Sequence, residues 1–236
     1  MVGVMVYPQS GWYMASTSNV RSFYNSTMGY IHTVRVGRSA GGDMAKRRLL
    51  EFVPWCLDNG VFTGKFNETD WLKKIDAMKP HINTCLFIVI PDVIGDCKST
   101  LAQFSHYRNM VKDFPVALVS QDGIKEHAEN IPWNDFDCLF VGGSDIHKLE
   151  KEGAWIIQEA KKRNKWVHVG RVNSASRILK FWQADSWDGT HLGFMPSDVS
   201  KFHAAVLQVR AMKQSKGLFD DLHTDVFSGD YSRQSL

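Results

Sequence analysis

The sequence predicts an α/β protein folded as a compact (β/α)8 barrel of the TIM type. Two observations predict this fold. Short, continuous apolar stretches alternate with segments of helical period from about residue 80 onward, and with three candidates upstream the strands number about eight, as such a barrel requires. An open doubly wound sheet would show the same alternation. No glycine-rich phosphate-binding motif follows any of the strands, however, and this favours the barrel.

The strand candidates follow one another in chain order. Residues 2–8 and 30–37 supply two strands near the N-terminus, and residues 52–60 supply the third. Five further apolar stretches end in the Pro, Gly, Asn, Asp or Ser residues that commonly bound strands: 85–92, 116–123, 138–145, 166–174 and 184–190.

Apolar side chains at helical spacing predict the helices that separate these strands. Ser99 is the expected N-cap of the helix after the fourth strand. The apolar stripes are Trp71, Leu72 and Ile75; Leu101, Phe104, Tyr107 and Val111; Leu149, Gly153, Ile156 and Ala160; Ile178, Leu179 and Trp182; and Val199, Phe202, Val206 and Val209. We interpret residues 1–220 as one barrel domain, irregular over 1–48, and residues 221–236 as a polar tail.

Composition and charge exclude several classes of protein. The formal net charge of +3 and the sequence pI of about 8.6 permit a nucleic-acid partner without requiring one. We find no apolar run long enough to span a membrane and no signal peptide. Cys56, Cys85, Cys97 and Cys138 are too widely spaced for a zinc motif or a disulfide framework. We therefore expect a reduced, cytoplasmic protein without a metal site.

Polar residues gather where the strands end. In a parallel barrel these ends share one face, the mouth, where catalytic residues collect. Turn chemistry accounts for any one such end by itself, because Asp, Asn and Gly favour turns and helix caps. All six later ends are polar, which predicts a site at the mouth: Asp58, Asn59 and Gly60; Asp92; Gln121, Asp122 and Gly123; Gly142 and Gly143; Gly170, Arg171 and Asn173; and Asp188 and Gly189.

Strand parity separates the two acids of the segment ADSWDGT at 184–190. Side chains alternate along a strand, so Asp185 and Asp188 face opposite ways, whereas Ser186 and Asp188 share a side. Asp188 stands at the carboxyl end of the strand, directly before Gly189. It is therefore the acid expected at the mouth, and Asp185 is expected to bond a neighbouring helix or the backbone.

Several motifs together resemble a known superfamily. LDNGVF at 57–62 resembles the DSGGFQ-type motif of the tRNA-guanine transglycosylases. The motifs PDVIGD, VALVSQDG, WNDFDCLFVGGS, KWVHVGRVNS and DSWDGTHLGF look most like the smaller DpdA-type DNA-guanine transglycosylases of phages and bacterial islands. Those relatives insert 7-deazaguanine bases into DNA. The resemblance covers residues 50–195.

This resemblance implies roles for particular residues. It makes Asp188 the nucleophile and Asp58 the general acid/base, and it assigns recognition of the heterocycle to Asp92, Gln121 and the backbone of Gly142 and Gly143. The tRNA enzymes carry a Cys3His zinc subdomain after the barrel, and this chain has no counterpart. Its absence favours a DNA substrate over tRNA, unless another chain supplies the zinc subdomain.

The implied chemistry suits these residue types. Exchange of a base with retention requires a carboxylate that attacks the sugar C1′ and a second group that carries protons. A carboxylate such as Asp92 suits the N1–H and N2–H₂ donors of guanine, while an amide or a glycine N–H suits O6. Asn59 lies at the same strand end as Asp58. Phe62 and Trp187 are aromatic candidates to hold a flipped base, unless either ring simply belongs to the core.

Cationic and polar side chains that could contact a nucleic acid occur in two places. Arg171 and Asn173 lie at a strand end, and Arg38, Arg47 and Arg48 lie in the glycine-containing segment 34–48. An ordinary solvated loop would explain the second group equally well. His168 and His191 lie near the proposed site, where they either orient other groups or only fill space.

Three functional hypotheses follow from the sequence. The first is an enzyme that exchanges guanine in DNA for a 7-deazaguanine base of the preQ0 type, through a covalent aspartyl-sugar intermediate and without a cofactor. The second is a DNA glycosylase with the same fold, which would hydrolyse the N-glycosidic bond. The third is a non-catalytic subunit that binds nucleic acid or a partner. The sequence leaves a homodimer open, and a phage-encoded protein would act in the host cytoplasm.

Overall fold

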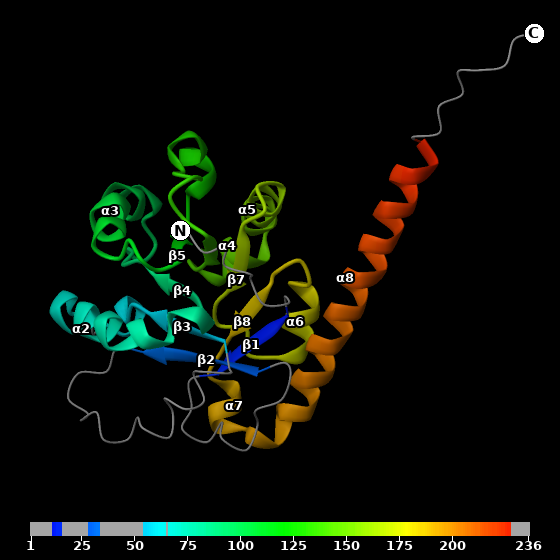
Figure 1. Cartoon of the computed structure of the whole chain (residues 1–236), viewed down its shortest axis with the longest axis horizontal. Coiled ribbons are helices and arrows are strands. Elements are labelled where there is room, and N and C mark those ends of the chain that lie inside the picture. The colour runs from blue at the N-terminus through cyan, green and yellow to red at the C-terminus, as the bar shows by residue number, and fades with distance from the viewer. Residues whose placement is uncertain (1–10, 16–27, 34–53, 65, 228–236) are drawn as a thin grey trace, which may run out of the picture.

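Eight parallel strands close into a barrel in which each strand pairs with its neighbours in chain order and β1 pairs with β8 (Figure 1). The computed structural model describes residues 11–15, 28–33, 54–64 and 66–227. The strands are β1 (Trp12–Ala15), β2 (Met28–Thr33), β3 (Trp55–Asp58), β4 (Cys85–Val89), β5 (Val116–Ser120), β6 (Cys138–Val141), β7 (Trp166–Val169) and β8 (Ser186–Asp188). The predicted (β/α)8 barrel is confirmed.

Two predicted strands near the N-terminus need correction. The first predicted strand, 2–8, lies outside the described residues, and β1 is instead Trp12–Ala15, a stretch not predicted as a strand. β2 begins at Met28, two residues before the predicted start, and ends at Thr33. Long-range contacts stabilise β1, so the local sequence pattern does not predict this strand. The Tyr13 hydroxyl donates a hydrogen bond to the Val172 carbonyl at 3.0 Å, and the Tyr13 ring packs on Phe202.

Helices cover the outside of the barrel (Figure 1). The α-helices are α2 (Glu68–Met78), α3 (Cys97–Met110), α4 (Asp145–Leu149), α5 (Lys151–Lys162), α6 (Ala175–Lys180), α7 (His191–Phe194) and α8 (Val199–Phe227). Short 3-10 helices complete the connections: η3 (Val61–Thr63), η4 (Lys79–Thr84), η5 (Ile124–Asn130) and η6 (Pro196–Asp198).

Two helix predictions differ from the structure in detail. Asp96, not Ser99, caps α3, because its carboxylate accepts a hydrogen bond from the Ser99 N–H at 2.9 Å. The helix predicted around Leu149 and Gly153 divides at Glu150, whose backbone is extended, into α4 and α5. A Cβ atom at Gly153 would stand 2.5 Å from the Lys148 carbonyl oxygen, so this tight corner requires glycine.

Two apolar cores hold the fold together. One fills the barrel and includes Met14, Cys56, Phe87, Val119 and Cys138, while the larger one lies between the strands and the helices. All four cysteines are buried free thiols. Within the described residues, no helix is long and apolar enough to cross a membrane.

Asp185 joins three strands and two helices at the end of the barrel opposite the mouth. Its carboxylate pairs with Lys161 of α5 at 2.7 Å and with Lys213 of α8 at 3.1 Å, and it accepts the Val167 N–H. Its carbonyl accepts the Gly11 N–H at the start of β1. The predicted structural role of Asp185 is therefore confirmed.

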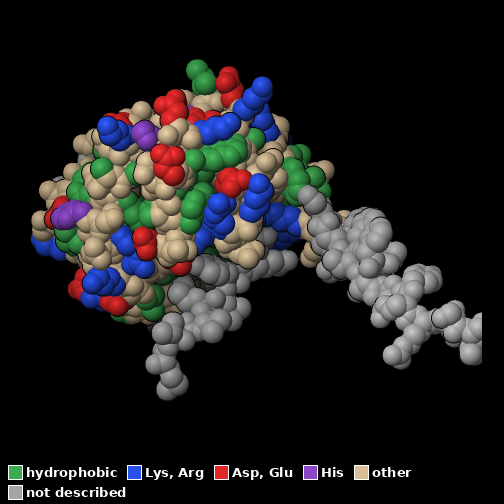
Figure 2. Space-filling view, turned by 90° about the horizontal axis from the view of Figure 1, so that it is seen from above, with side chains coloured by type: hydrophobic (Ala, Val, Ile, Leu, Met, Phe, Trp, Pro, Cys, Tyr) green, Lys and Arg blue, Asp and Glu red, His purple; other side chains and the backbone are tan. Residues whose placement is uncertain are grey.

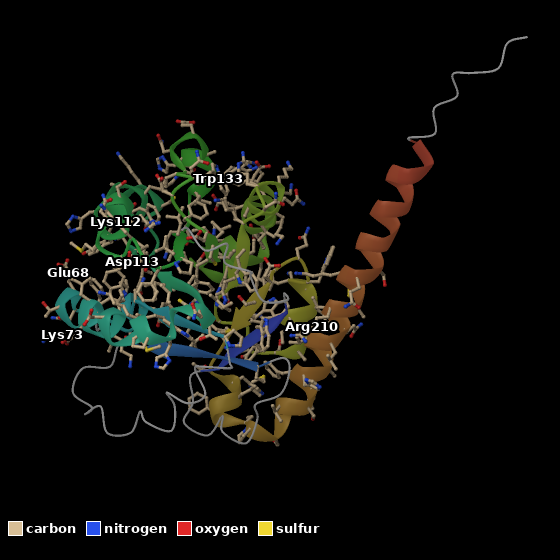
Figure 3. All side chains as sticks on the ribbon, viewed as in Figure 1. Glu68, Lys73, Lys112, Asp113, Trp133 and Arg210 are labelled. Carbon is tan, nitrogen blue, oxygen red and sulfur yellow. The ribbon has the colours of Figure 1, made fainter. Side chains whose placement is uncertain are left out.

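The long helix α8 supports this closure. It runs beside α6, and its last part extends past the barrel (Figure 1). Arg210, on the part of α8 that passes the barrel, donates to the Gly11 carbonyl at 2.8 Å and lies over the Trp12 ring (Figure 3). Helix α8 therefore closes the seam between β8 and β1.

Replacement of Asp185 should destabilise the protein. Asp185→Asn leaves two ammonium groups without their carboxylate, so the free energy of unfolding should fall by about 2–4 kcal/mol; the partial exposure of Lys161 limits the loss. Urea denaturation measures it. Glu159→Gln, which removes a carboxylate from the surface of α5, is the control and should have a much smaller effect. An Asp185→Asn loss no larger than that of the control would contradict this role.

Candidate functional site

Side-chain alternation along the strands brings the polar strand ends together at the mouth of the barrel. Cys56 faces the barrel interior, so Asp58, two residues later, continues that interior face at the carboxyl end of β3. Ser186 and Asp188 share a face of β8 in the same way, and β8 stands in register with the interior Met14 of β1. The mouth is thus lined by two acids from strands on either side of β1 and β2.

Asp188 is held by one of its two oxygens. Its Oδ1 accepts the backbone N–H of Arg171 at 2.7 Å and lies 3.8 Å from Nε2 of His168. Its Oδ2 has no hydrogen-bond or ion-pair partner among the described residues. A Cβ atom at Gly170 would come within 3.4 Å of Oδ1 and 2.7 Å of the Phe140 ring, so glycine leaves room for this carboxylate. Oδ2 is therefore the oxygen available for reaction.

Asp58 has a different electrostatic environment. Its pKa is raised from 3.8 to about 6, chiefly by burial and then by the negative charges of Asp188 and, more weakly, Asp92, against hydrogen bonds from the Gly60 and Asn59 backbone that lower it. A carboxyl group with this pKa can give and take a proton near neutral pH. Asp58 ends β3 and Asp188 ends β8, and the negative charge of Asp188 is the second-largest cause of the rise in the pKa of Asp58.

Two amides fix the carboxylate of Asp92. Asn59 donates to Asp92 Oδ1 at 2.8 Å, and Gln121 donates to Oδ2 at 2.5 Å. The Asn59 side chain also bonds to the Ile90 carbonyl and the Val61 N–H, and the Gln121 oxygen accepts the Gly95 N–H. Burial raises the pKa of Asp92, and the two amide hydrogen bonds oppose that rise. Asn59 and Gln121, predicted as base contacts, here orient a third carboxylate.

The two predicted glycines differ in what their backbones can offer. The Gly142 N–H donates to the Ser120 carbonyl at 3.2 Å and so already has an acceptor. Gly143 has a φ of +68°, which favours glycine, and its N–H has no acceptor within the described part of the chain. Its carbonyl accepts the guanidinium of Arg171. Of the two amides, that of Gly143 is the one free to meet a ligand.

Arg171 spans the mouth. It is a non-glycine residue with a φ of +59°, an uncommon backbone conformation that directs its N–H at Asp188. Its guanidinium lies 4.7 Å from the centre of the Phe62 ring and bonds to the Gly143 carbonyl. Phe62 follows β3 and is 62% exposed. The side chains of Arg171 and Phe62 therefore form an arginine–aromatic pair across the opening.

The other predicted residues have varied positions. Asn173 accepts hydrogen bonds from the N–H groups of Thr190 and His191, and so fixes the loop after β8. Trp187 is fully buried among the helices, where it cannot hold a flipped base, which corrects that expectation. Arg38, Arg47 and Arg48 lie outside the described residues.

Lys148 is a mouth residue that the sequence did not reveal. Its side chain is buried on α4 and donates to the Gly170 carbonyl at 3.2 Å. Burial lowers its pKa, and the charge of Arg171 lowers it further. No motif marks Lys148, because an exposed helical lysine would look the same in the sequence.

A serine, a histidine and a glutamate are aligned beside the mouth. Ser120 Oγ lies 3.2 Å from Nε2 of His147, whose Nδ1 lies 2.8 Å from Glu152. A surface hollow adjoins them, lined by Asp122, Lys125, Ile146, His147, Glu150, Lys151 and Glu152, but not by Asp58 or Asp188. Ser120 is completely buried, so this alignment holds two mouth loops together and offers no accessible nucleophile.

Comparisons with known proteins give a distant structural similarity. No protein-family model and no curated protein matches the sequence. Among solved structures, the chain is similar to L-talarate dehydratase from Polaromonas sp. JS666 in complex with Mg and L-glucarate, with a TM-score of 0.46 and 13% identity. The match covers 79% of this chain and 55% of that one.

In the described residues, no three His, Cys, Asp or Glu side chains are grouped to hold a metal.

The pKa of Asp58 can be tested directly. NMR titration of the aspartate carboxyl carbons should give a midpoint near 6 for Asp58, and Asp188→Asn should lower that midpoint because it removes a neighbouring negative charge. Since the folded pKa exceeds 3.8, the native state binds the proton more tightly than the unfolded chain does. Stability should therefore decline as the pH rises from about 4 through 6, and Asp58→Asn should remove that part of the decline.

An Asp58 midpoint near the ordinary value of 3.8 would contradict this account of the site. A midpoint near 6 that Asp188→Asn leaves unchanged would contradict the proximity of the two acids. Asp135, an exposed aspartate before β6, provides an internal reference in the same spectra.

Proposed function

We propose that the protein exchanges guanine in DNA for a 7-deazaguanine base of the preQ0 type. The observation that carries this proposal is the pair of acids at the mouth. Asp188 has one oxygen held and one free, while burial and the charge of Asp188 raise the pKa of Asp58 to about 6. Base exchange with retention needs one carboxylate that attacks and another acid that moves protons. The resemblance of residues 50–195 to the DNA-guanine transglycosylases gives independent support.

The first half of the reaction removes guanine. Asp188 Oδ2 attacks C1′ of the sugar, the bond between C1′ and N9 breaks, and its electron pair leaves with the base. Protonated Asp58 donates its proton to the departing guanine. A covalent ester then joins Asp188 to C1′, and Asp58 is ionised.

The second half installs the new base. Ionised Asp58 takes the N9 proton of the incoming 7-deazaguanine, whose N9 attacks C1′ on the face that guanine left. The ester bond breaks and its electron pair returns to Asp188 Oδ2. Asp58 again holds a proton, so the cycle closes without a redox step.

Asp92 suits recognition of either base. Its carboxylate is oriented by Asn59 and Gln121 and can accept the N1–H and N2–H₂ donors of a guanine-type edge. The free N–H of Gly143 can donate to O6. Guanine and its 7-deaza analogues share these groups, as the two halves of the exchange require.

An apolar rim supports a nucleic-acid partner. Large apolar side chains are exposed on four of the loops that follow strands: Phe62, Ile94, Ile146, and Phe194 with Met195. Aromatic and aliphatic side chains of this kind stack on bases or insert between them when a base leaves its stack. On the face that Figure 2 shows, Lys and Arg lie among Asp and Glu without forming one basic field. Stacking at the rim should therefore contribute much of the affinity.

The activity test uses purified protein, guanine-containing DNA and preQ0, with mass spectrometry of the digested nucleosides. Wild type should incorporate preQ0. Asp58→Asn should slow incorporation by about 10²–10⁴-fold, because it removes the proton carrier. Asp188→Asn should abolish it, because no ester can form. Asp135→Asn, at the opposite end of the barrel, should leave it unchanged.

Other outcomes would reject this proposal in distinct ways. Abasic sites without incorporation would indicate a DNA glycosylase. Incorporation into tRNA but not DNA would identify the other nucleic acid. Full activity of Asp188→Asn would exclude the assigned nucleophile, and binding of DNA without any chemistry would favour a non-catalytic subunit.

A further inference from the structure

His168 lies inside the barrel directly below the proposed nucleophile. It is fully buried, and its ring contacts the rings of Phe87 and Phe140, with centroids 5.1 and 4.6 Å away. Its Nε2 lies 3.8 Å from Oδ1 of Asp188 and has no hydrogen-bond partner among the described residues. A buried polar atom without a partner costs about 1–3 kcal/mol, so a ring that only fills space would be better made of carbon.

The hydrogen bonds below His168 determine which nitrogen carries the hydrogen. Nε1 of Trp166 donates to Ser186 Oγ at 2.8 Å, because an indole N–H can only donate. Ser186 Oγ also lies 2.8 Å from Nδ1 of His168. If Nδ1 carried the hydrogen, Ser186 would accept twice, and its own hydroxyl hydrogen would have no acceptor among the described residues. If Ser186 instead donates to a bare Nδ1, the Trp166 N–H, the Ser186 hydroxyl and Nδ1 are all paired, and the ring hydrogen lies on Nε2.

The same conclusion follows from the Asp188 side. With a bare Nε2, a nitrogen lone pair would face a carboxylate oxygen across 3.8 Å in an interior lined by aromatic rings. With Nε2–H, the positive end of a dipole faces that oxygen. Interactions of this kind are strong where water is excluded. The hydrogen bonds on the Ser186 side of the ring and the carboxylate on its Asp188 side therefore favour the same tautomer.

We propose that His168 is an Nε2–H tautomer, fixed by Trp166 and Ser186, and that it is a positioning residue for Asp188. Its Nε2 and the backbone N–H of Arg171 both lie near the same oxygen, Oδ1, at 3.8 and 2.7 Å. They fix the rotation of the carboxylate so that Oδ2 points to the sugar. The positioning role rests on the proposed function, whereas the tautomer is a property of the free protein.

The tautomer is tested by ¹⁵N NMR of the imidazole nitrogens in the free, unliganded protein. We expect a bare Nδ1 and a protonated Nε2 for His168, and Ser186→Ala should disturb this pattern because it removes the donor to Nδ1. A hydrogen on Nδ1, in either a neutral or a cationic ring, would overturn the inference. This result does not depend on any enzymatic activity.

The positioning role is tested by two substitutions of His168, each of which places a side-chain amide where one of the two ring nitrogens lies. The amide of His168→Gln can reach the position of Nε2, whereas that of His168→Asn reaches only the position of Nδ1. His168→Asn should lower kcat for base exchange by about 10- to 100-fold with little change in KM, because the attacking oxygen is misoriented. His168→Gln should restore most of that loss. Thermal denaturation of both variants reports on folding.

The possible outcomes distinguish a failure of the proposed base exchange from a failure of the inference about His168. Equal losses in the two variants, in proportion to their loss of stability, would reduce His168 to a packing residue and overturn the positioning role. Wild type without base exchange would reject the proposed function, and the NMR result would still decide the tautomer. Active wild type with a hydrogen on Nδ1 would reject the inference alone.

Discussion

The strict alternation of side chains in a closed barrel is the constraint on which the site depends. Each strand contributes every second residue to the barrel axis, so the register decides which strand ends face the mouth. In β8 this rule sends Asp188 to the mouth and Ser186 into the interior, and Asp185 lies at the opposite end of the barrel. A slip of β8 by one residue would turn Asp188 and Ser186 to the outside of the barrel and Trp187 to the inside. The ion pairs of Asp185 with Lys161 and Lys213 oppose such slippage.

Different surroundings distinguish the two mouth acids. The Asp188 oxygen Oδ1 receives an N–H from Arg171, whose unusual backbone conformation is required for that contact. Burial raises the pKa of Asp58, and the charge of Asp188 adds to that rise. Two chemically identical groups thereby become suited to different tasks, which is the usual way that one site carries out both attack and proton transfer.

Sequence reasoning reached the barrel and both mouth acids because each depends on a local pattern. Alternation within ADSWDGT separates Asp185 from Asp188, and an aspartate before Asn59 and Gly60 marks the end of β3. Features set by tertiary contacts were missed. β1 is a short aromatic strand stabilised by Phe202 and Val172, and the burial of Lys148 depends on how α4 packs. The clamp of Asn59 and Gln121 on Asp92 joins three strand ends, which no local pattern predicts.

The central claim, that Oδ2 of Asp188 attacks the sugar, is tested most directly by the covalent intermediate. Wild-type protein is incubated with guanine-containing DNA in the absence of an incoming base, denatured, digested and examined by mass spectrometry. We expect a DNA adduct on the peptide that contains Trp187 and Asp188, and we expect this adduct to disappear when preQ0 is added. An adduct on Asp58, or base exchange that proceeds with no adduct on any residue, would contradict the account.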